Sequence, residues 1–372
     1  MKHSGIRRLA AGLWLLVAGC MATGAEAPQP LGGTLSPFAQ APTLDGKIAP
    51  GEWDNAIRTV NFLSIFQQMM DPREGSAMLG FHGDRLYIAI TSELPPRPTN
   101  GPFSVATQRD TEVIWDANAI EIWFDPNRDR RESGAGDQAF YQLFVNTLGT
   151  TEDARITPGT AGDKGWNPDV TSAHMLDTAA RVWTAEISIA MKDLGMNPAA
   201  LTGSSMGLLI SRNYKAPWNQ VTAFRHSGAF VAWGQYPQFR FTADAPVVGI
   251  RSLGDKFFQA EPDFQLAIRN PGPARTAKVK LHIKSSDMPD LIDEKELPLP
   301  AGGAADYRLT VPKERLHIPE VDHSVSIRIG SADGKETWFN YAAGWSHDPM
   351  TTIGWGTGRR SIEKKWDIRT TA

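Results

Sequence analysis

The stretch VIWDANAIEIWFDPNRD, residues 113–129, decides the fold class, because from residue 119 onward apolar and polar residues alternate at the spacing of a β-strand. One face of this strand takes Ile120, Ile122 and Phe124. The opposite face takes Glu121, Trp123 and Asp125. We expect the first face to pack in a core. The second combines an indole with two carboxylates, which are costly in an apolar interior. It therefore predicts a solvated outer face or a binding face.

Further short strand candidates lie on both sides of this stretch, between about residues 38 and 245, and turn residues separate them. They are SAMLGFHG (76–83), RLYIAITSE (85–93), FYQLFVNTLG (140–149), RVWTAEISIAM (181–191), MGLLISRNY (206–214) and FRFTA (239–243). The best helical candidate, AMKDLGMNPAAL (190–201), is short and is interrupted by Gly195 and Pro198. This pattern predicts an all-β chain whose first unit, residues 38–245, is an antiparallel β-sandwich.

A second, smaller unit is predicted over residues 246–343. Its alternating segments are FQLAIRNPGPARTAKVKLHIKSS (264–286), ADYRLTVP (305–312) and HSVSIRIGSADGKETWFNY (323–341). The pair Asp333-Gly334 suits a type I′ hairpin turn. We expect an immunoglobulin-like β-sandwich without the cysteine pair of true immunoglobulin domains. Residues 344–372 show no clear element.

The N-terminus has the pattern of an export signal over residues 1–20. Lys2, Arg7 and Arg8 precede the apolar run LAAGLWLLVAG (9–19), which is too short to span a bilayer. Cys20 ends this run and resembles the lipidated cysteine of bacterial lipoproteins; alternatively, the small residues of ATGAEA (22–27) offer later cleavage sites. Residues 21–37 are rich in Ala, Gly and Pro and are predicted to be a linker. The protein is thus expected in the periplasm or at the outer membrane or cell surface, with a lipid anchor as its membrane contact.

Composition excludes several functional classes. The chain has 372 residues, a net charge of −3 and a pI near 6.3, so it lacks the basic footprint of a nucleic-acid-binding protein. Cys20 is the single cysteine and has no intrachain disulfide partner. No zinc-protease helix or glycine-rich phosphate loop occurs in the sequence. These features favour a binding protein over an enzyme.

The order of several motifs resembles the family 9 carbohydrate-binding modules over roughly residues 40–245. These motifs are PTLDGKIAPGEWDNA (42–56), GDRLYIAI (83–90), WDANAIEIWFDP (115–126), YQLFVNTLG (141–149), VWTAEISI (182–189) and MGLLISRN (206–213). The resemblance implies a β-sandwich that binds an oligosaccharide or polysaccharide on one face. It also implies an association with glycoside hydrolases and carbohydrate catabolism.

The resemblance implies that Trp115 and Glu121 belong to the sugar site. Trp115 stands six residues before Glu121, the spacing at which the family places one aromatic wall of its sugar site. An indole face can bury the apolar face of a pyranose ring, and a carboxylate accepts hydrogen bonds from hydroxyl groups. The alternatives are a tryptophan that packs on its own sandwich and a glutamate that pairs with a neighbouring strand.

The sequence also departs from the family pattern. Phe144 replaces an arginine that would grip neighbouring hydroxyl groups. We expect Arg212, with Asn213 beside it, to supply that charge from an adjacent strand. For the second aromatic wall we favour Trp218. The other candidates are Phe224, Phe230 and Trp233, the last of which is expected to pack as core.

The sequence DPNRD suggests a structural calcium ion. Asp125, Asn127 and Asp129 occupy positions one, three and five, the spacing at which calcium loops present oxygen ligands. Arg130 stands where an EF-hand requires glycine, so the loop is not an EF-hand. The alternative is an acidic turn that nearby arginines neutralise.

Three other functions stay open, and one is an enzyme whose active site lies at the cleft between the two units. Related sandwich domains in exported oxidoreductases bind haem b, and Met69 or Met70 with His82 would offer a thioether and an imidazole for such a haem. The chain could instead be a structural sandwich that has lost sugar binding, for which Phe144 is the best argument.

Overall fold

The computed structural model describes residues 31–65, 69–71, 73–94, 106–110, 118–128, 139–159, 162–215, 218–224, 226, 229–253, 263–286, 288–312 and 322–346. Nearly all regular structure in these ranges is β-strand, and the strands form two sheets that pack face to face. The predicted all-β sandwich fold is confirmed. None of the helices in these ranges is long and apolar enough to cross a membrane.

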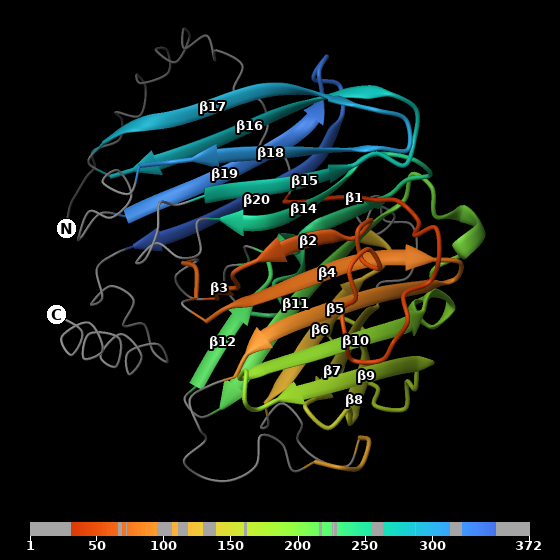
Figure 1. Ribbon diagram of the computed structural model, residues 1–372. Helices are drawn as coiled ribbons and strands as arrows, with labels where there is room; N and C mark the ends of the chain where they lie inside the picture. The colour runs from red at the N-terminus through yellow and green to blue at the C-terminus, as the bar shows by residue number, and fades with distance from the viewer. Residues whose placement is uncertain are drawn as a thin grey trace, which may run out of the picture.

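The larger sheet has twelve strands and runs through both predicted units (Figure 1). Its main path is β17 (Met288–Leu299), β16 (Arg275–Ser285), β19 (Asp322–Ser331), β20 (Thr337–Ser346), β1 (Gly32–Leu35), β13 (Gln238–Phe241), β11 (Ser205–Lys215), β6 (Ala119–Asp125), β7 (Phe140–Asn146) and β8 (Thr151–Ile156). β12 (Trp218–Thr222) pairs with β11 and with β3 (Leu63–Ser64).

The smaller sheet has eight strands and also runs through both units. Its order is β18 (Ala304–Thr310), β15 (Asp263–Arg269), β14 (Val247–Leu253), β2 (Ile57–Val60), β4 (Gly75–His82), β5 (Arg85–Glu93), β10 (Val182–Ala190) and β9 (Val170–Asp177). The main hydrophobic core lies between the two sheets.

The alternation over residues 119–125 separates the core from an outer face. Ile120, Ile122 and Phe124 are fully buried in the main core, as predicted. The opposite face of β6 is not solvated, because Glu121 and Trp123 are only 4% and 5% exposed. Other side chains cover this face, and Trp123 packs there in a separate cluster with Leu209 and Tyr236.

The two units are joined edge to edge by strand pairing. β1 pairs with β13 of the first unit and with β20 of the second, and β14 pairs with β2. The predicted linker over residues 21–37 is therefore wrong for residues 32–35, which form β1 in the interior of the larger sheet. Gly32 has a φ of +125°, and a Cβ there would lie 1.9 Å from the carbonyl oxygen of Gln238. The glycines that are typical of a linker here allow β1 to pack closely against its neighbouring strand.

Two local predictions need correction. The helical candidate at residues 190–201 forms two short 3-10 helices, η2 (Met191–Leu194) and η3 (Pro198–Ala200), and Gly195 ends the first at a φ of +68°. The hairpin between β19 and β20 is present, but of the pair Asp333-Gly334 only Gly334 has a positive φ. A type I′ turn needs both residues there, so the turn type was wrong.

The motif PTLDGKIAPGEWDNA packs on the outer face of the smaller sheet. Glu186 of β10 is fully buried and accepts hydrogen bonds from the backbone N–H groups of Asp45 at 3.0 Å and Gly46 at 2.8 Å. It also accepts one from the Trp53 indole at 3.1 Å. Trp53 in turn covers a small core with Met78 and other residues of β4 and β5. The conspicuous tryptophan of this motif thus has a structural role.

Candidate functional site

The candidate site lies on the outer face of the larger sheet, where β6, β7 and β11 lie side by side. Glu121 is paired across the strands with Phe144 and Ser211. Its Oε1 accepts hydrogen bonds from the Trp123 indole at 2.6 Å and from the Gln142 amide at 2.9 Å. Its Oε2 accepts one from the Asn213 amide at 2.6 Å. Three donors from three strands therefore fix this carboxylate.

A second set of bonds orients Asn213. Its side-chain oxygen accepts a hydrogen bond from the Ser211 hydroxyl at 2.9 Å, which assigns the amide nitrogen to Glu121. We call Glu121, Trp123, Gln142, Ser211 and Asn213 the amide network. It contains one ionisable group and no cation.

Burial raises the pKa of the Glu121 carboxyl group above its ordinary value, and the bonds from Trp123, Gln142 and Asn213 oppose that rise. Each carboxylate oxygen has two lone pairs. Among the described residues Oε2 accepts one hydrogen bond, which leaves capacity for one more donor. A ligand hydroxyl group has the chemistry to use that capacity.

The structure separates two residues that the sequence placed together. Asn213 joins Glu121, as expected, but Arg212 faces the opposite way, into the space between the sheets. The Arg212 side chain is fully buried and donates to the Ser92 hydroxyl at 3.1 Å and to Asp71 at 3.4 Å. Consecutive residues of a strand point to opposite faces, so the assignment of Arg212 to the sugar site was wrong.

The aromatic candidates on this face are packed. Phe144 is 4% exposed and contacts Ala106 and Ala119. Trp233, in the short 3-10 helix η4 (Trp233–Gln235), stacks on Phe140 with ring centroids 3.8 Å apart. The packing expected for Trp233 is therefore present.

The two preferred tryptophans are located only in part. Position 218 begins β12, and the strand register pairs it with position 215 of β11. Since positions 220 and 213 are also paired, position 218 shares a sheet face with Asn213. Trp115 lies outside the described residues, as does Cys20.

The proposed calcium turn contains a buried arginine. Asp125 and Asn127 are 1% and 3% exposed, and Asp129 lies outside the described residues. The Arg128 guanidinium donates to the carbonyl oxygens of Trp233 and Gly234 and lies 4.0 Å from the Asp125 carboxylate. In the described ranges, no group of three or more acidic, histidine or cysteine side chains could hold a metal ion.

The residues of the haem alternative lie at opposite ends of β4. Met70 lies near the start of β4. Its backbone forms a β-bridge with Leu63, and its sulfur accepts a hydrogen bond from the Asn61 amide. The backbone N–H of Asn61 donates to the carbonyl oxygen of Gly75, the first residue of β4. His82 ends the same strand, where its Nδ1 bonds to the carbonyl oxygen of Phe38. An eight-residue strand is about 23 Å long, too far for both residues to bind one haem iron.

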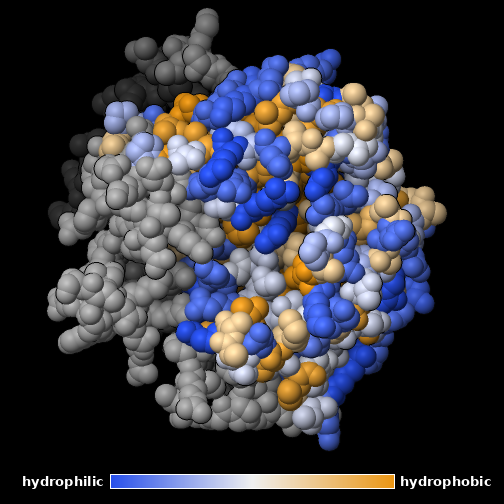
Figure 2. Space-filling model, in the orientation of Figure 1, coloured by the Kyte–Doolittle hydropathy of each residue, from blue (hydrophilic) through white to orange (hydrophobic). Residues whose placement is uncertain are grey.

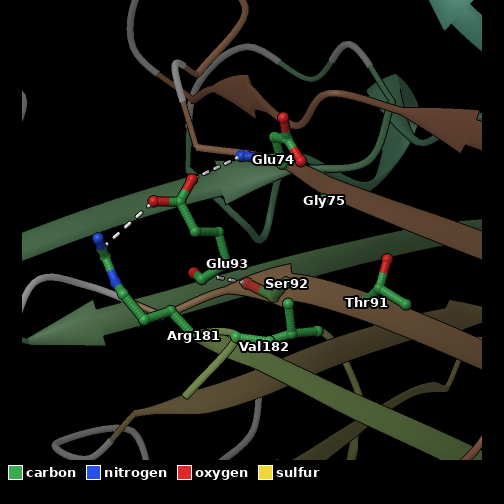
Figure 3. Close-up of a pocket in the computed structure, with 8 residues that line it drawn as sticks. Glu74, Gly75, Thr91, Ser92, Glu93, Arg181 and Val182 are labelled. Atoms are coloured by element: carbon green, nitrogen blue, oxygen red, sulfur yellow. Dashed lines mark hydrogen bonds and ion pairs between the residues drawn. The ribbon is translucent and has the colours of Figure 1, made fainter. Parts of the chain in front are cut away.

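A shallow pocket of about 350 Å³ lies on the smaller sheet (Figure 3). It is lined by Glu74, Gly75, Thr91, Ser92, Glu93, Ala180, Arg181 and Val182. Within it the Glu93 carboxylate accepts bonds from the backbone N–H of Glu74 and from the Arg181 guanidinium. Glu93 and Arg181 of the pocket therefore pair with each other, and the pocket belongs to the other sheet from the amide network.

Comparison with known proteins gives structural neighbours only. No family model and no curated protein matches the sequence. A protein from Bacteroides uniformis ATCC 8492 with a proposed carbohydrate-binding role aligns over 57% of this chain and 100% of its own, with 11% identity and a TM-score of 0.44. A family 9 carbohydrate-binding module from Caldicellulosiruptor kristjanssonii, in complex with cellotriose, aligns over 56% of this chain and 93% of its own, with 17% identity and a TM-score of 0.39. Its glucose complex gives a TM-score of 0.38 with 17% identity, over 56% of this chain and 95% of its own. None of these matches assigns the chain to a family.

Proposed function

We propose that this protein binds a neutral saccharide non-covalently on the outer face of the larger sheet, at the amide network. Trp115 and Trp218 would flank the sugar, and Glu121 and Asn213 would contact its hydroxyl groups. We extend the proposal to a role beside glycoside hydrolases in carbohydrate catabolism. The sequence motifs that resemble family 9 carbohydrate-binding modules support it.

One observation carries the proposal: a buried carboxylate is fixed by amide and indole donors on a face outside the main core. Such a group costs stability when it is buried, and an apolar residue at the same position would avoid that cost. Preorganised amides and a carboxylate suit ligand hydroxyl groups, which both donate and accept hydrogen bonds.

Calorimetric titration against mono- and oligosaccharides tests the site. Trp115→Ala is expected to abolish affinity for every sugar that the wild type binds, because stacking does not depend on the hydroxyl pattern. Glu121→Gln is expected to lower the affinity by about ten- to a hundredfold, because one hydrogen-bond partner is lost. The loss should depend on the hydroxyl pattern of the sugar.

Glu93→Gln is the matched control, since Glu93 is a half-buried, hydrogen-bonded acid of the smaller sheet. It should leave sugar affinity unchanged. Each variant must first melt as the folded protein does. Equal affinity of Trp115→Ala and wild type for a bound sugar would show that the site lies elsewhere.

A second candidate function is favoured by the saturation of Oε1 of Glu121 and by the packing of Phe144. Both features suit a structural sandwich whose sugar site has been filled by its own side chains. Wild-type protein that binds no saccharide at millimolar concentration would favour this reading.

We also propose that Cys20 is lipidated and anchors the exported protein to a membrane. Mass spectrometry of the mature N-terminus is expected to show a diacylated chain that begins at residue 20. A chain that begins at Glu26 or Pro28 would contradict the anchor.

Calcium at Asp125, Asn127 and Asp129 remains part of the proposal. Since a ligand that binds only the folded state stabilises it, we expect a chelator to lower the melting temperature and calcium to restore it. The measurement is a thermal melt in excess chelator and in excess calcium. Identical melts would mean that Arg128, and no metal ion, neutralises the turn.

A further inference from the structure

A row of residues outside the candidate site combines charged side chains with very small ones. It crosses the outer face of the smaller sheet, where the two units meet. Strand pairing sets the order of the row as Asp306 of β18, Ala267 of β15, Gly249 of β14 and Arg58 of β2. Ala267 and Gly249 therefore form a low floor between an acidic and a basic side chain. Figure 2 shows hydrophilic residues gathered on this face, over the region of these strands.

Arg58 differs from the other arginines around this floor. Arg251 lies 3.3 Å from Asp306, and Arg269 lies 2.6 Å from Asp54, so each has a carboxylate partner. The Arg58 Nε is buried and, within the described part of the chain, has no hydrogen-bond partner. Burial, followed by the charge of Arg251, lowers the pKa of Arg58. The charge of Arg251 thus acts on a half-buried cation.

Arg251 of β14 reaches the other end of the same floor, where its guanidinium lies 3.3 Å from Asp306. The pairing of β14 with β15 shifts between Ile250 and Ser252, which leaves Arg251 as the extra residue of a β-bulge. Bulges bend a strand and redirect a side chain, and they recur beside binding sites. Arg251 lies two residues from Gly249, the residue that pairs with Arg58.

We propose that Arg58 and Arg251 bind an oxyanion, a carboxylate, sulfate or phosphate group, over the floor of Gly249 and Ala267. Guanidinium groups bind such groups through two parallel N–H···O bonds, and a half-buried position strengthens them. The oxyanion would supply the negative charge that Arg58 lacks. This site is separate from the amide network, and its two strands come from different units.

Titration calorimetry of the full chain with sulfate, phosphate and glucuronate, at constant ionic strength held with chloride, tests the proposal. We expect saturable binding of at least one probe and at least tenfold weaker binding by Arg58→Gln. Arg308→Gln is the matched control, because Arg308 lies on the same face but is paired with Asp263 at 2.7 Å. It should change affinity by less than twofold.

Stability provides a second measurement. Without oxyanions, Arg58→Gln should melt at the wild-type temperature or above it, because it removes a half-buried cation that has no carboxylate partner. Sulfate and phosphate stabilise many proteins because they are excluded from the protein surface. Therefore only an increase in melting temperature that the wild type shows with these anions, and that Arg58→Gln lacks, supports the site.

The probes also identify the source of the charge. Binding of glucuronate alone would assign the site to an acidic saccharide, and binding of sulfate or phosphate to a tetrahedral anion. The proposal fails if no probe gives saturable heat, if Arg58→Gln binds as wild type does, or if Arg308→Gln loses as much affinity as Arg58→Gln.

Discussion

Replacing Asp71 with asparagine is expected to lower the free energy of unfolding by about 3–5 kcal/mol, the usual effect of leaving a buried charge without its partner. Asp71 is 5% exposed, and its Oδ1 accepts from the Arg212 guanidinium and from the backbone N–H of Arg73. Arg212 and Arg73 are 0% and 1% exposed. The variant would therefore keep the buried Arg212 guanidinium and lose the carboxylate charge that it pairs with.

The control for this prediction is Asp169→Asn. Asp169 pairs with Arg85 at 2.8 Å, but its side chain is 57% exposed. Exposed ion pairs contribute at most about 1 kcal/mol, so the control should scarcely change the urea midpoint. Equal midpoints for the two variants would show that the buried pair is energetically unimportant.

The second large effect is expected for Glu186→Gln, at roughly 2–4 kcal/mol. Glutamine offers one oxygen and one amide nitrogen where three donors converge on the carboxylate, from Asp45, Gly46 and Trp53. The amide nitrogen would face at least one of these donors. The loss should be local as well as global, because this contact holds residues 45–53 on the smaller sheet.

Hydrogen exchange measures the local part of this loss. The amides of Asp45 and Gly46 should exchange faster in Glu186→Gln than in the wild type, whereas those of β6 should keep their relative protection. Glu74→Gln, an exposed acid directly before β4 of the same sheet, is the control. Unchanged exchange at Gly46 would contradict the role assigned to Glu186.

The strands with strong alternation could be predicted from the sequence, and those without it could not. RLYIAITSE coincides with β5, and the stretch around Glu121 gives β6 within a residue. β17 was missed because its exposed positions are charged and its sequence resembles a polar loop. β1 was missed because its glycines, which allow close strand contact at Gly32, are also typical of linkers.

The site could be predicted in part for a similar reason. Glu121 was placed on the outer face by its spacing, and Asn213 followed from its strand. The period of two also forbids Arg212 and Asn213 from sharing a face, and this signal is present in the sequence itself. Gln142 was missed because its role depends on the register between β6 and β7, which local sequence does not encode.

The position of β1 has a mechanical consequence. Its hydrogen bonds run sideways to β13 and β20, so a pull on the chain before residue 32 loads these bonds in shear, all at once. An edge strand pulled from its end would instead open one bond at a time. With the anchor proposed at Cys20, drag on a bound ligand would pass through β1, in the middle of the twelve-stranded sheet.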